Sequence, residues 1–123
     1  MEAGGLGKVY QDGEIIVRQG EIGNAMYVIQ SGKAEVVGEV NGNSVPLAVL
    51  GENDFFGEMA LFEDQVRSAT VRALGTVRVL TVDKKTLLRR IQQDPALAFR
   101  MLEHLCHRVR KLDSELGRIK TAQ

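Results

Sequence analysis

Short β-branched runs closed by turn-forming residues are the feature of this sequence that most limits its fold. Six such runs occupy residues 15–17, 26–29, 34–40, 45–50, 69–73 and 77–82. Dipeptides such as Ser31-Gly32 and Leu74-Gly75 separate them, and an Asn-Gly pair between residues 40 and 45 is typical of a β-hairpin. Many short strands at regular spacing predict a sandwich, a jelly roll or a barrel over about residues 8–83.

A different periodicity begins at Asp83, which can cap a helix starting at Lys84-Lys85. Asp94-Pro95 then restarts the chain, with aspartate as the N-cap and proline at the first helical position. The residues after this restart form a heptad seam of Ala98, Leu102, Leu105, Val109, Leu112, Leu116 and Ile119. Either the strand region or a second copy of the helix would cover this seam, and we expect a homodimer. The sequence therefore predicts one mainly β domain over residues 8–119, with helices over about residues 84–119.

Charge and composition exclude several classes of protein. The chain carries 16 basic and 16 acidic residues, so no global charge directs it to nucleic acid or to a membrane. The basic residues gather beyond residue 83, where they form either a solvated helical face or a contact surface for an acidic partner. No apolar run approaches the ~20 residues of a membrane-spanning helix, and residues 1–7 lack the features of a secretory leader. One cysteine, Cys106, excludes an internal disulfide, so we expect a cytoplasmic protein.

The segment DFFGEMALFEDQVRSATVRA, residues 54–73, carries the chemistry. Residues 57–61 can form a short helix after an apolar strand end, and the start of such a helix presents free amides to an anion. Arg67 offers a planar charged fork, and the small Ser68 and Ala69 let backbone N–H groups approach a phosphate. Glu58 accepts hydrogen bonds when ionised, which suits a ribose hydroxyl. These residues indicate a ligand with a hydroxyl pair and a phosphate, although a structural Glu58–Arg67 ion pair would explain the same two residues.

FGEMAL followed by RSATV resembles the phosphate-binding cassette of the cyclic-nucleotide-binding family. That family includes bacterial catabolite activator protein and the regulatory parts of cyclic-nucleotide-dependent kinases and channels. The likeness covers nearly the whole chain, because Gly20-Glu21-x-Gly23 and Ser31-Gly32 match the family's barrel turns and Asp94-Pro95 matches the start of its C-terminal helix. The resemblance implies a β jelly-roll barrel followed by a helix and a long dimerisation helix, with cAMP or cGMP as the ligand.

The resemblance also implies a role for each matching residue. Glu58 would accept from the ribose 2′-hydroxyl, and Arg67 would bind the exocyclic phosphate oxygens. The turn and the remaining phosphate contacts would come from Gly57, Met59, Ala60, Ser68 and Ala69. The base would rest on Val36, Leu47, Leu50 and Val71, and would reach Leu112 and Asp113 on the long helix. The family often has proline before the arginine, and here Val66 stands in that position.

These residues predict a binding sensor that signals through its long helix, and not an enzyme. Residues 1–83 contain no histidine, which excludes a cupin-like metal catalyst, and we expect His104 and His107 to be solvated helix residues. The resemblance implies that the residue after the arginine, Ser68, favours cAMP over cGMP. We expect no cofactor, no metal, no membrane contact and no direct nucleic-acid binding. The alternatives are the effector and dimerisation part of a transcription regulator whose DNA-binding part is absent, or a family member that has lost nucleotide binding.

Overall fold

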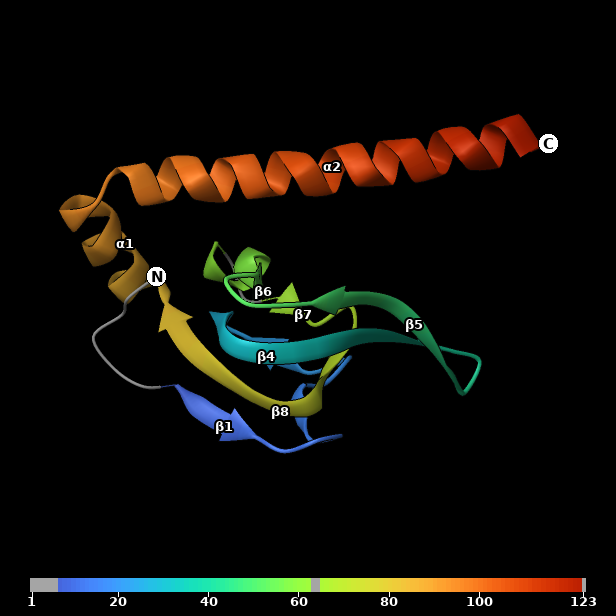
Figure 1. Cartoon of the computed structure of the whole chain (residues 1–123), viewed down its shortest axis with the longest axis horizontal. Helices are drawn as coiled ribbons and strands as arrows, with labels where there is room; N and C mark the ends of the chain where they lie inside the picture. The colour runs from blue at the N-terminus through green and yellow to red at the C-terminus, as the bar shows by residue number, and fades with distance from the viewer. Residues whose placement is uncertain (1–6, 63–64, 123) are drawn as a thin grey trace. The chain divides into compact units, whose positions relative to one another are not determined.

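The computed structural model of the chain describes residues 7–62 and 65–122 (Figure 1). These residues group into two units, a strand unit that ends at Lys84 and a helix unit that begins at Lys85. The strands and the 3₁₀ helix η1 are, in chain order, β1 Lys8–Tyr10, β2 Ile15–Val17, β3 Ile22–Gly23, β4 Ala25–Val40, β5 Asn43–Leu50, β6 Phe55–Phe56, η1 Glu58–Leu61, β7 Gln65–Val66 and β8 Thr70–Asp83. The helices that follow are α1 Lys84–Gln93 and α2 Ala96–Ala122.

Strands β4 and β8 pair antiparallel along most of their length and form the centre of the strand unit (Figure 1). The main sheet runs in the order β1-β8-β4-β5, with β2 added to β8 and β6 added to β4. Strands β3 and β7 form a separate two-stranded sheet. Pairing among the described strands does not return from β5 to β1, so a closed jelly-roll barrel stays a prediction.

The length of β4 and β8 differs from the expectation. The sequence predicts strand ends at Ser31-Gly32 and Leu74-Gly75, and both predictions are wrong, because each strand continues through its dipeptide. The register shifts on either side of Ser31 instead. Gly32 has φ 86°, and a Cβ there would overlap the carbonyl oxygen of Thr76, so two backbones meet where no side chain fits. These glycines mark irregular pairing within long strands.

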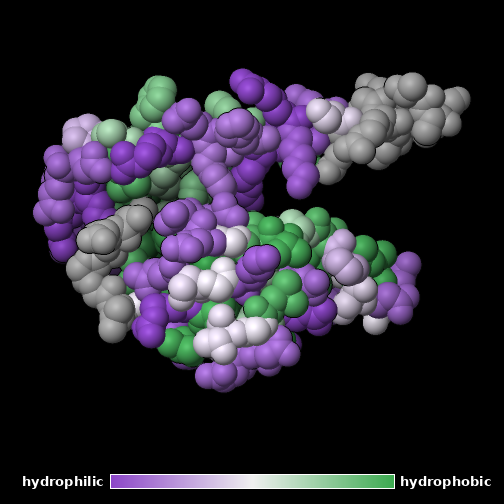
Figure 2. All heavy atoms as spheres, viewed as in Figure 1, coloured by the Kyte–Doolittle hydropathy of each residue, from purple (hydrophilic) through white to green (hydrophobic). Residues whose placement is uncertain are grey.

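The hairpin between β4 and β5 forms where the sequence predicts it. Val40 pairs with Asn43, which leaves Asn41 and Gly42 as a two-residue turn. Both have positive φ, 53° and 79°, the combination that a type I′ turn requires. The turn places β5 at the edge of the sheet, and Figure 2 shows apolar surface in the region of this strand, where Leu47 is exposed.

Apolar residues of the two long strands fill the core of the strand unit. Met26, Ile29, Val77 and Val82 are 0% exposed. One cluster of buried side chains consists of Ile29, Ala34, Phe56, Val71, Ala73, Val77 and Val79. Burying each valine or isoleucine contributes roughly 1.5–3 kcal/mol, so the β4–β8 pair provides the frame that holds the surrounding turns.

Both helices begin within one residue of the expected position. Helix α1 starts at Lys84, directly after Asp83, and α2 starts at Ala96, directly after Asp94-Pro95. The Asp94 carbonyl oxygen accepts from the Leu97 N–H at 2.9 Å, the first bond of that helical turn. Within the described ranges no helix has the length and apolar character to cross a membrane. The mainly β fold with two C-terminal helices is confirmed, whereas a single domain over residues 8–119 stays a prediction.

Candidate functional site

The backbone of Arg67 is fixed by the turn that follows β2. Arg67 comes directly after β7, whose Val66 pairs with Ile22 of β3. The Arg67 N–H donates to the Glu21 carbonyl oxygen at 2.7 Å, and the Arg67 carbonyl accepts from the Gly20 N–H at 2.9 Å. Both polar groups of the Arg67 backbone are therefore held by neighbouring residues of one turn.

The Arg67 side chain is buried, and the residue is 9% exposed. Its Nη2 donates to the Ala25 carbonyl oxygen at 2.8 Å, and its Nη1 donates to the Gly57 carbonyl oxygen at 3.3 Å. Its Cζ lies 5.6 Å from the ring centroid of Tyr27, within the range of a cation–π contact. A guanidinium has five N–H donors, so the two carbonyls leave part of the fork without a partner among the described residues.

This guanidinium is a buried charge held by neutral groups. None of the ion pairs between described residues includes Arg67. A buried cation is costly unless a negative charge lies beside it, and carbonyl oxygens supply only partial charge. An anion that reached the fork would form short, charge-assisted hydrogen bonds in a partly desolvated place. The arrangement is therefore chemically suited to bind an anion.

Glu58 opens the short helix η1, as the sequence predicts for residues 57–61. Gly57 precedes it in the left-handed conformation with φ 77°. The Gly57 carbonyl oxygen accepts from the Ala60 N–H at 3.2 Å as well as from Arg67. Ala60 is buried and Met59 is exposed. The structure thus joins the start of η1 to Arg67 through one carbonyl, while the ligand contacts expected of Glu58, Met59 and Ala60 stay predictions.

The residues after Arg67 are tied to the same turn. Ser68 is exposed and Ala69 is half-buried. Thr70 is buried, and its Oγ1 accepts from the Gln19 N–H at 2.9 Å. The Gln19–Glu21 turn therefore fixes both ends of the predicted phosphate-binding stretch. The sequence indicates a turn here but gives no sign of this role, because the bonds join residues far apart in the chain.

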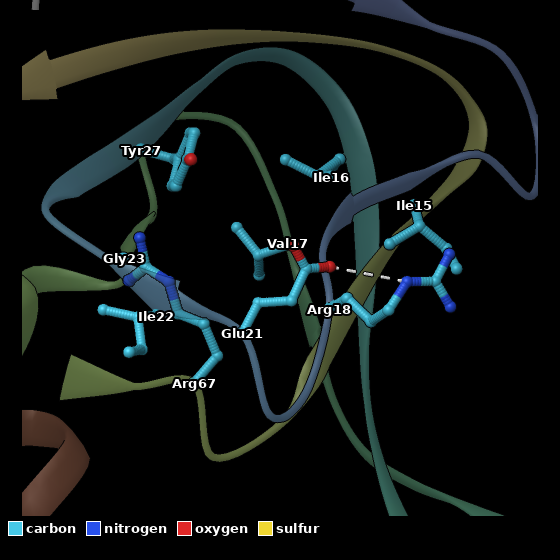
Figure 3. A pocket seen from close by; sticks show the side chains of 9 residues that line it. All are labelled: Ile15, Ile16, Val17, Arg18, Glu21, Ile22, Gly23, Tyr27 and Arg67. Atoms are coloured by element: carbon cyan, nitrogen blue, oxygen red, sulfur yellow. Dashed lines mark ion pairs between the residues drawn. The ribbon is translucent and has the colours of Figure 1, made fainter.

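A cavity of about 230 Å³ opens beside Arg67 (Figure 3). Its lining consists of Ile15, Ile16, Val17, Arg18, Glu21, Ile22, Gly23, Tyr27 and Arg67. Arg18 Nε and Glu21 Oε1 form an exposed ion pair 3.5 Å apart at this cavity. In the described part of the chain no group of three or more His, Cys, Asp or Glu side chains could hold a metal ion. The lining includes Arg67 from the predicted site and adds apolar residues of β2 to which the sequence assigns no role.

The residues predicted to support a base are partly brought together. Val36 pairs with Val71 across β4 and β8. Val71 belongs to the buried core cluster, and the half-buried Val36 and Leu50 pack against that cluster. Tyr27, which lines the cavity, packs against the same core cluster. Leu47 lies beside a register shift between β4 and β5 and is 59% exposed. The structure therefore groups three of the four residues and leaves Leu47 at the surface.

The predicted residues of the long helix belong to the helix unit. Leu112 and Asp113 lie on α2 and are exposed, and their contact with a base stays a prediction. Of the seam, Leu102, Val109 and Leu112 are exposed, and Leu105 is half-buried. The side chains of Leu116 and Ile119 lie outside the described residues.

The sequence model of the family "Cyclic nucleotide-binding domain" matches residues 7–94, which include every strand, η1 and α1. The chain belongs to the cyclic nucleotide-binding domain family. The match contains Glu58, Arg67 and the turn that holds Arg67. The resemblance expected from FGEMAL and RSATV is thereby confirmed.

This cyclic nucleotide-binding domain is similar to parts of larger proteins. The cAMP-dependent protein kinase regulatory subunit of Schizosaccharomyces pombe is 48% identical over 81 residues, which cover 66% of this chain and 19% of that protein. The cGMP-dependent protein kinase of Plasmodium berghei is 36% identical over 110 residues, which cover 87% of this chain and 11% of the kinase. The crystal structure of the Thermus thermophilus catabolite activator protein matches with a TM-score of 0.79 and 32% identity, over 92% of this chain and 54% of that one. The chain therefore spans a small part of the kinases and about half of the activator.

Proposed function

We propose that this domain is a sensor that binds cAMP, with the phosphate on the Arg67 fork and the ribose 2′-hydroxyl on Glu58. The observation that carries the proposal is the buried Arg67 guanidinium, whose described partners are neutral carbonyls. A cyclic phosphate supplies the negative charge that this place lacks. The names of the two kinase relatives, one cAMP-dependent and one cGMP-dependent, support the class of ligand.

The other ligand contacts are assigned by the family cassette. The turn and its N–H groups would come from Gly57, Met59, Ala60, Ser68 and Ala69. The base would lie on Val36, Leu47, Leu50 and Val71, and a base bound there would cover part of the exposed Leu47. The strand unit would belong to a jelly-roll barrel, which the TM-score of 0.79 to the activator protein supports. None of the assigned contacts pairs a nucleophile with a base, so we expect binding without hydrolysis.

Titration calorimetry of the purified chain with cAMP and cGMP tests the ligand. We expect one site with a dissociation constant of about 1 μM or lower for cAMP, and recovery of the nucleotide unchanged. Adenosine, which lacks the phosphate, is the matched control and should bind at least about 30-fold more weakly. No heat with either cyclic nucleotide, at tens of micromolar protein, would leave the alternative of a family member that has lost nucleotide binding.

The preference for cAMP rests on Ser68, which follows Arg67 and is exposed. Thr in this position of the family favours cGMP, because its hydroxyl can meet the guanine amino group. We expect Ser68→Thr to shift the ratio of the two dissociation constants toward cGMP by about ten-fold, the value of one hydrogen bond. Competition binding measures this ratio, with Ser68→Ala as the control. An unchanged ratio in Ser68→Thr would show that Ser68 does not set the preference.

We further propose that α2 pairs with a second copy and transmits the signal. The seam residues Leu102, Val109 and Leu112 are 60%, 57% and 60% exposed in the single chain, an apolar stripe that a second copy would cover. Sedimentation should show a dimer that Leu105→Glu with Leu112→Glu dissociates, whereas Lys111→Glu, which lies off the seam, leaves it intact. A monomeric wild type would contradict the pairing.

Hydrogen exchange tests whether a bound nucleotide reaches this helix. We expect cAMP to protect amides of residues 105–116 as well as those of the cassette over residues 57–69. Protection confined to the cassette would show that nucleotide binding does not affect α2.

The single cysteine, Cys106, is free and exposed, and we expect the domain to work in the reducing cytoplasm.

A second candidate function is the effector part of a transcription regulator. The similarity to the catabolite activator protein, over 92% of this chain, favours it. The test is a DNA-binding assay on the natural gene product at its full length, with and without cAMP. Tighter DNA binding in the presence of cAMP would support a role in a transcription regulator. DNA binding that cAMP does not tighten would favour a sensor without a DNA-binding part.

A further inference from the structure

Gly23 lies directly against the guanidinium of Arg67 (Figure 3). A Cβ added to Gly23 would overlap Nη2, Cζ and Nε of Arg67. A Cβ added to Gly57 would lie 2.6 Å from Nη1 of the same side chain. Two glycines from separate parts of the chain therefore leave the space that this guanidinium fills.

Space for Arg67 is the one requirement for glycine that we find at position 23. Gly23 belongs to β3, pairs with Gln65 of β7, and is absent from the glycines with positive φ, so an L-residue fits its backbone. Gly7 differs, because its Cβ would overlap the carbonyl oxygen of Val79, a backbone atom that cannot move freely. At Gly23 the obstacle is the far end of a flexible side chain. An alanine there would displace the guanidinium and leave the strand pair in place.

We infer that Gly23 is a positioning residue: by leaving space for the Arg67 guanidinium, it keeps the fork where the phosphate of a cyclic nucleotide can reach it. This inference rests on the proposed function. The Ala25 and Gly57 carbonyls accept from the guanidinium at 2.8 and 3.3 Å, and the Tyr27 ring lies beneath it within cation–π range. The two carbonyls, the Tyr27 ring and the space left by Gly23 together define one position of the guanidinium. A methyl group on residue 23 would overlap the guanidinium in that position and displace it. Phosphate recognition depends on parallel N–H groups, so a shift of about 1 Å weakens binding strongly.

The first test compares Gly23→Ala with Gly51→Ala. Gly51 is the matched control, because its added Cβ would meet nothing within 4 Å and its φ is not positive. We expect Gly23→Ala to weaken cAMP binding on the order of ten- to a hundred-fold, while Gly51→Ala leaves it unchanged. NMR of the arginine Nε–Hε groups gives a second measurement, since the Arg67 signal should shift in Gly23→Ala and stay in place in Gly51→Ala. Unchanged affinity together with an unchanged Arg67 signal would overturn the inference.

The second test repeats Gly23→Ala in an Arg67→Ala background, where the guanidinium is gone. A positioning role predicts that Gly23→Ala then changes cAMP affinity less than about two-fold. In urea unfolding of the ligand-free protein, Gly23→Ala should lower the midpoint when Arg67 is present. When Arg67 is absent, Gly23→Ala should leave the midpoint unchanged or raise it, because alanine lowers the conformational entropy of the unfolded chain. Equal losses in both backgrounds would show that Gly23 serves the fold alone.

These measurements separate the two proposals. Absence of cAMP binding by the wild type would refute the proposed function. The ligand-free unfolding midpoints and the Arg67 NMR signal would still decide whether Gly23 positions the guanidinium. A shifted signal, with a midpoint that Gly23→Ala lowers when Arg67 is present and does not lower when Arg67 is absent, supports it; equal lowering in both backgrounds with an unshifted signal contradicts it.

Discussion

Replacing Arg67 with alanine removes the charge on which the proposed binding of the phosphate depends. The residue is 9% exposed, so water and salt screen its charge weakly. Removing one partner of a buried, hydrogen-bonded charge pair costs roughly 2–5 kcal/mol. At 1.4 kcal/mol per factor of ten, the dissociation constant for cAMP should rise about 30- to several-thousand-fold. Glu58→Ala removes a hydroxyl bond to a charged acceptor, about 1.5–3 kcal/mol, and should raise it about 10- to 100-fold.

Arg67→Lys separates the charge from the shape of the fork. Lysine keeps the positive charge but carries it as a single point, so it cannot reproduce two parallel N–H groups. The affinity of Arg67→Lys for cAMP should therefore lie between those of the wild type and of Arg67→Ala. In the ligand-free protein Arg67→Ala removes the bond that Nη2 donates to the Ala25 carbonyl, at about 1–3 kcal/mol for a buried acceptor, whereas the Gly57 carbonyl keeps the Ala60 N–H as a donor. Loss of a desolvated cation offsets part of this, so urea unfolding is measured beside the binding.

The matched control is Arg78→Ala. Arg78 Nη1 also donates to a backbone carbonyl, that of Gly7 at 3.0 Å, but Arg78 is not among the residues that line the cavity. Calorimetry should show wild-type affinity for Arg78→Ala and the ranked losses for the other variants. Equal losses for Arg67→Ala and Glu58→Ala would mean that backbone amides hold the phosphate, and the reasoning from the buried charge would fail.

Two further substitutions test the surroundings of the site by urea unfolding. Thr70→Val leaves the Gln19 N–H without its acceptor and should lower the free energy of unfolding by about 1–3 kcal/mol. The control is Thr76→Val, at an exposed position within β8 where the hydroxyl makes a long, exposed bond of 3.4 Å to Gln11, and it should change this free energy by less than about 0.5 kcal/mol. Similar losses for the two would show that the Gln19 bond does not hold the turn. Gly42→Ala forces an L-residue to φ 79° and should cost about 1–2 kcal/mol, while Gly51→Ala is neutral or stabilising. A neutral Gly42→Ala would contradict the type I′ turn.

Local patterns predicted much of the fold. The Asn-Gly pair fixed the hairpin because two residues with positive φ close a two-residue turn, and Asp83 and Asp94-Pro95 marked the helix starts within one residue. The long strands were missed for a physical reason. Glycine and serine at 31–32 are turn formers in sequence, but here Gly32 allows a close approach of two backbones within a continuous strand. Composition alone does not separate these two uses of glycine.

The candidate site likewise contains residues that the sequence predicted and groups that it did not. Arg67 and Gly57 were predicted, and the structure joins them. Gly23 matched a family turn but received no role, and the Ala25 carbonyl received none, because its bond to Arg67 spans 42 residues and involves a backbone group that every residue carries. The exposure of Leu47 could not be predicted from the sequence either, because a register shift decides which way an edge-strand residue faces.

The pairing of β4 with β8 has a kinetic consequence. Its register joins Ala25 to Asp83 and Val37 to Thr70, so the contacts are non-local, and domains dominated by such contacts fold in roughly milliseconds to seconds. The β4–β5 hairpin can close early, but the groups around the Arg67 guanidinium meet only after the distant strands have aligned. A ligand that needs this assembled site cannot stabilise the folding transition state. Bound nucleotide should therefore slow unfolding and leave the folding rate unchanged.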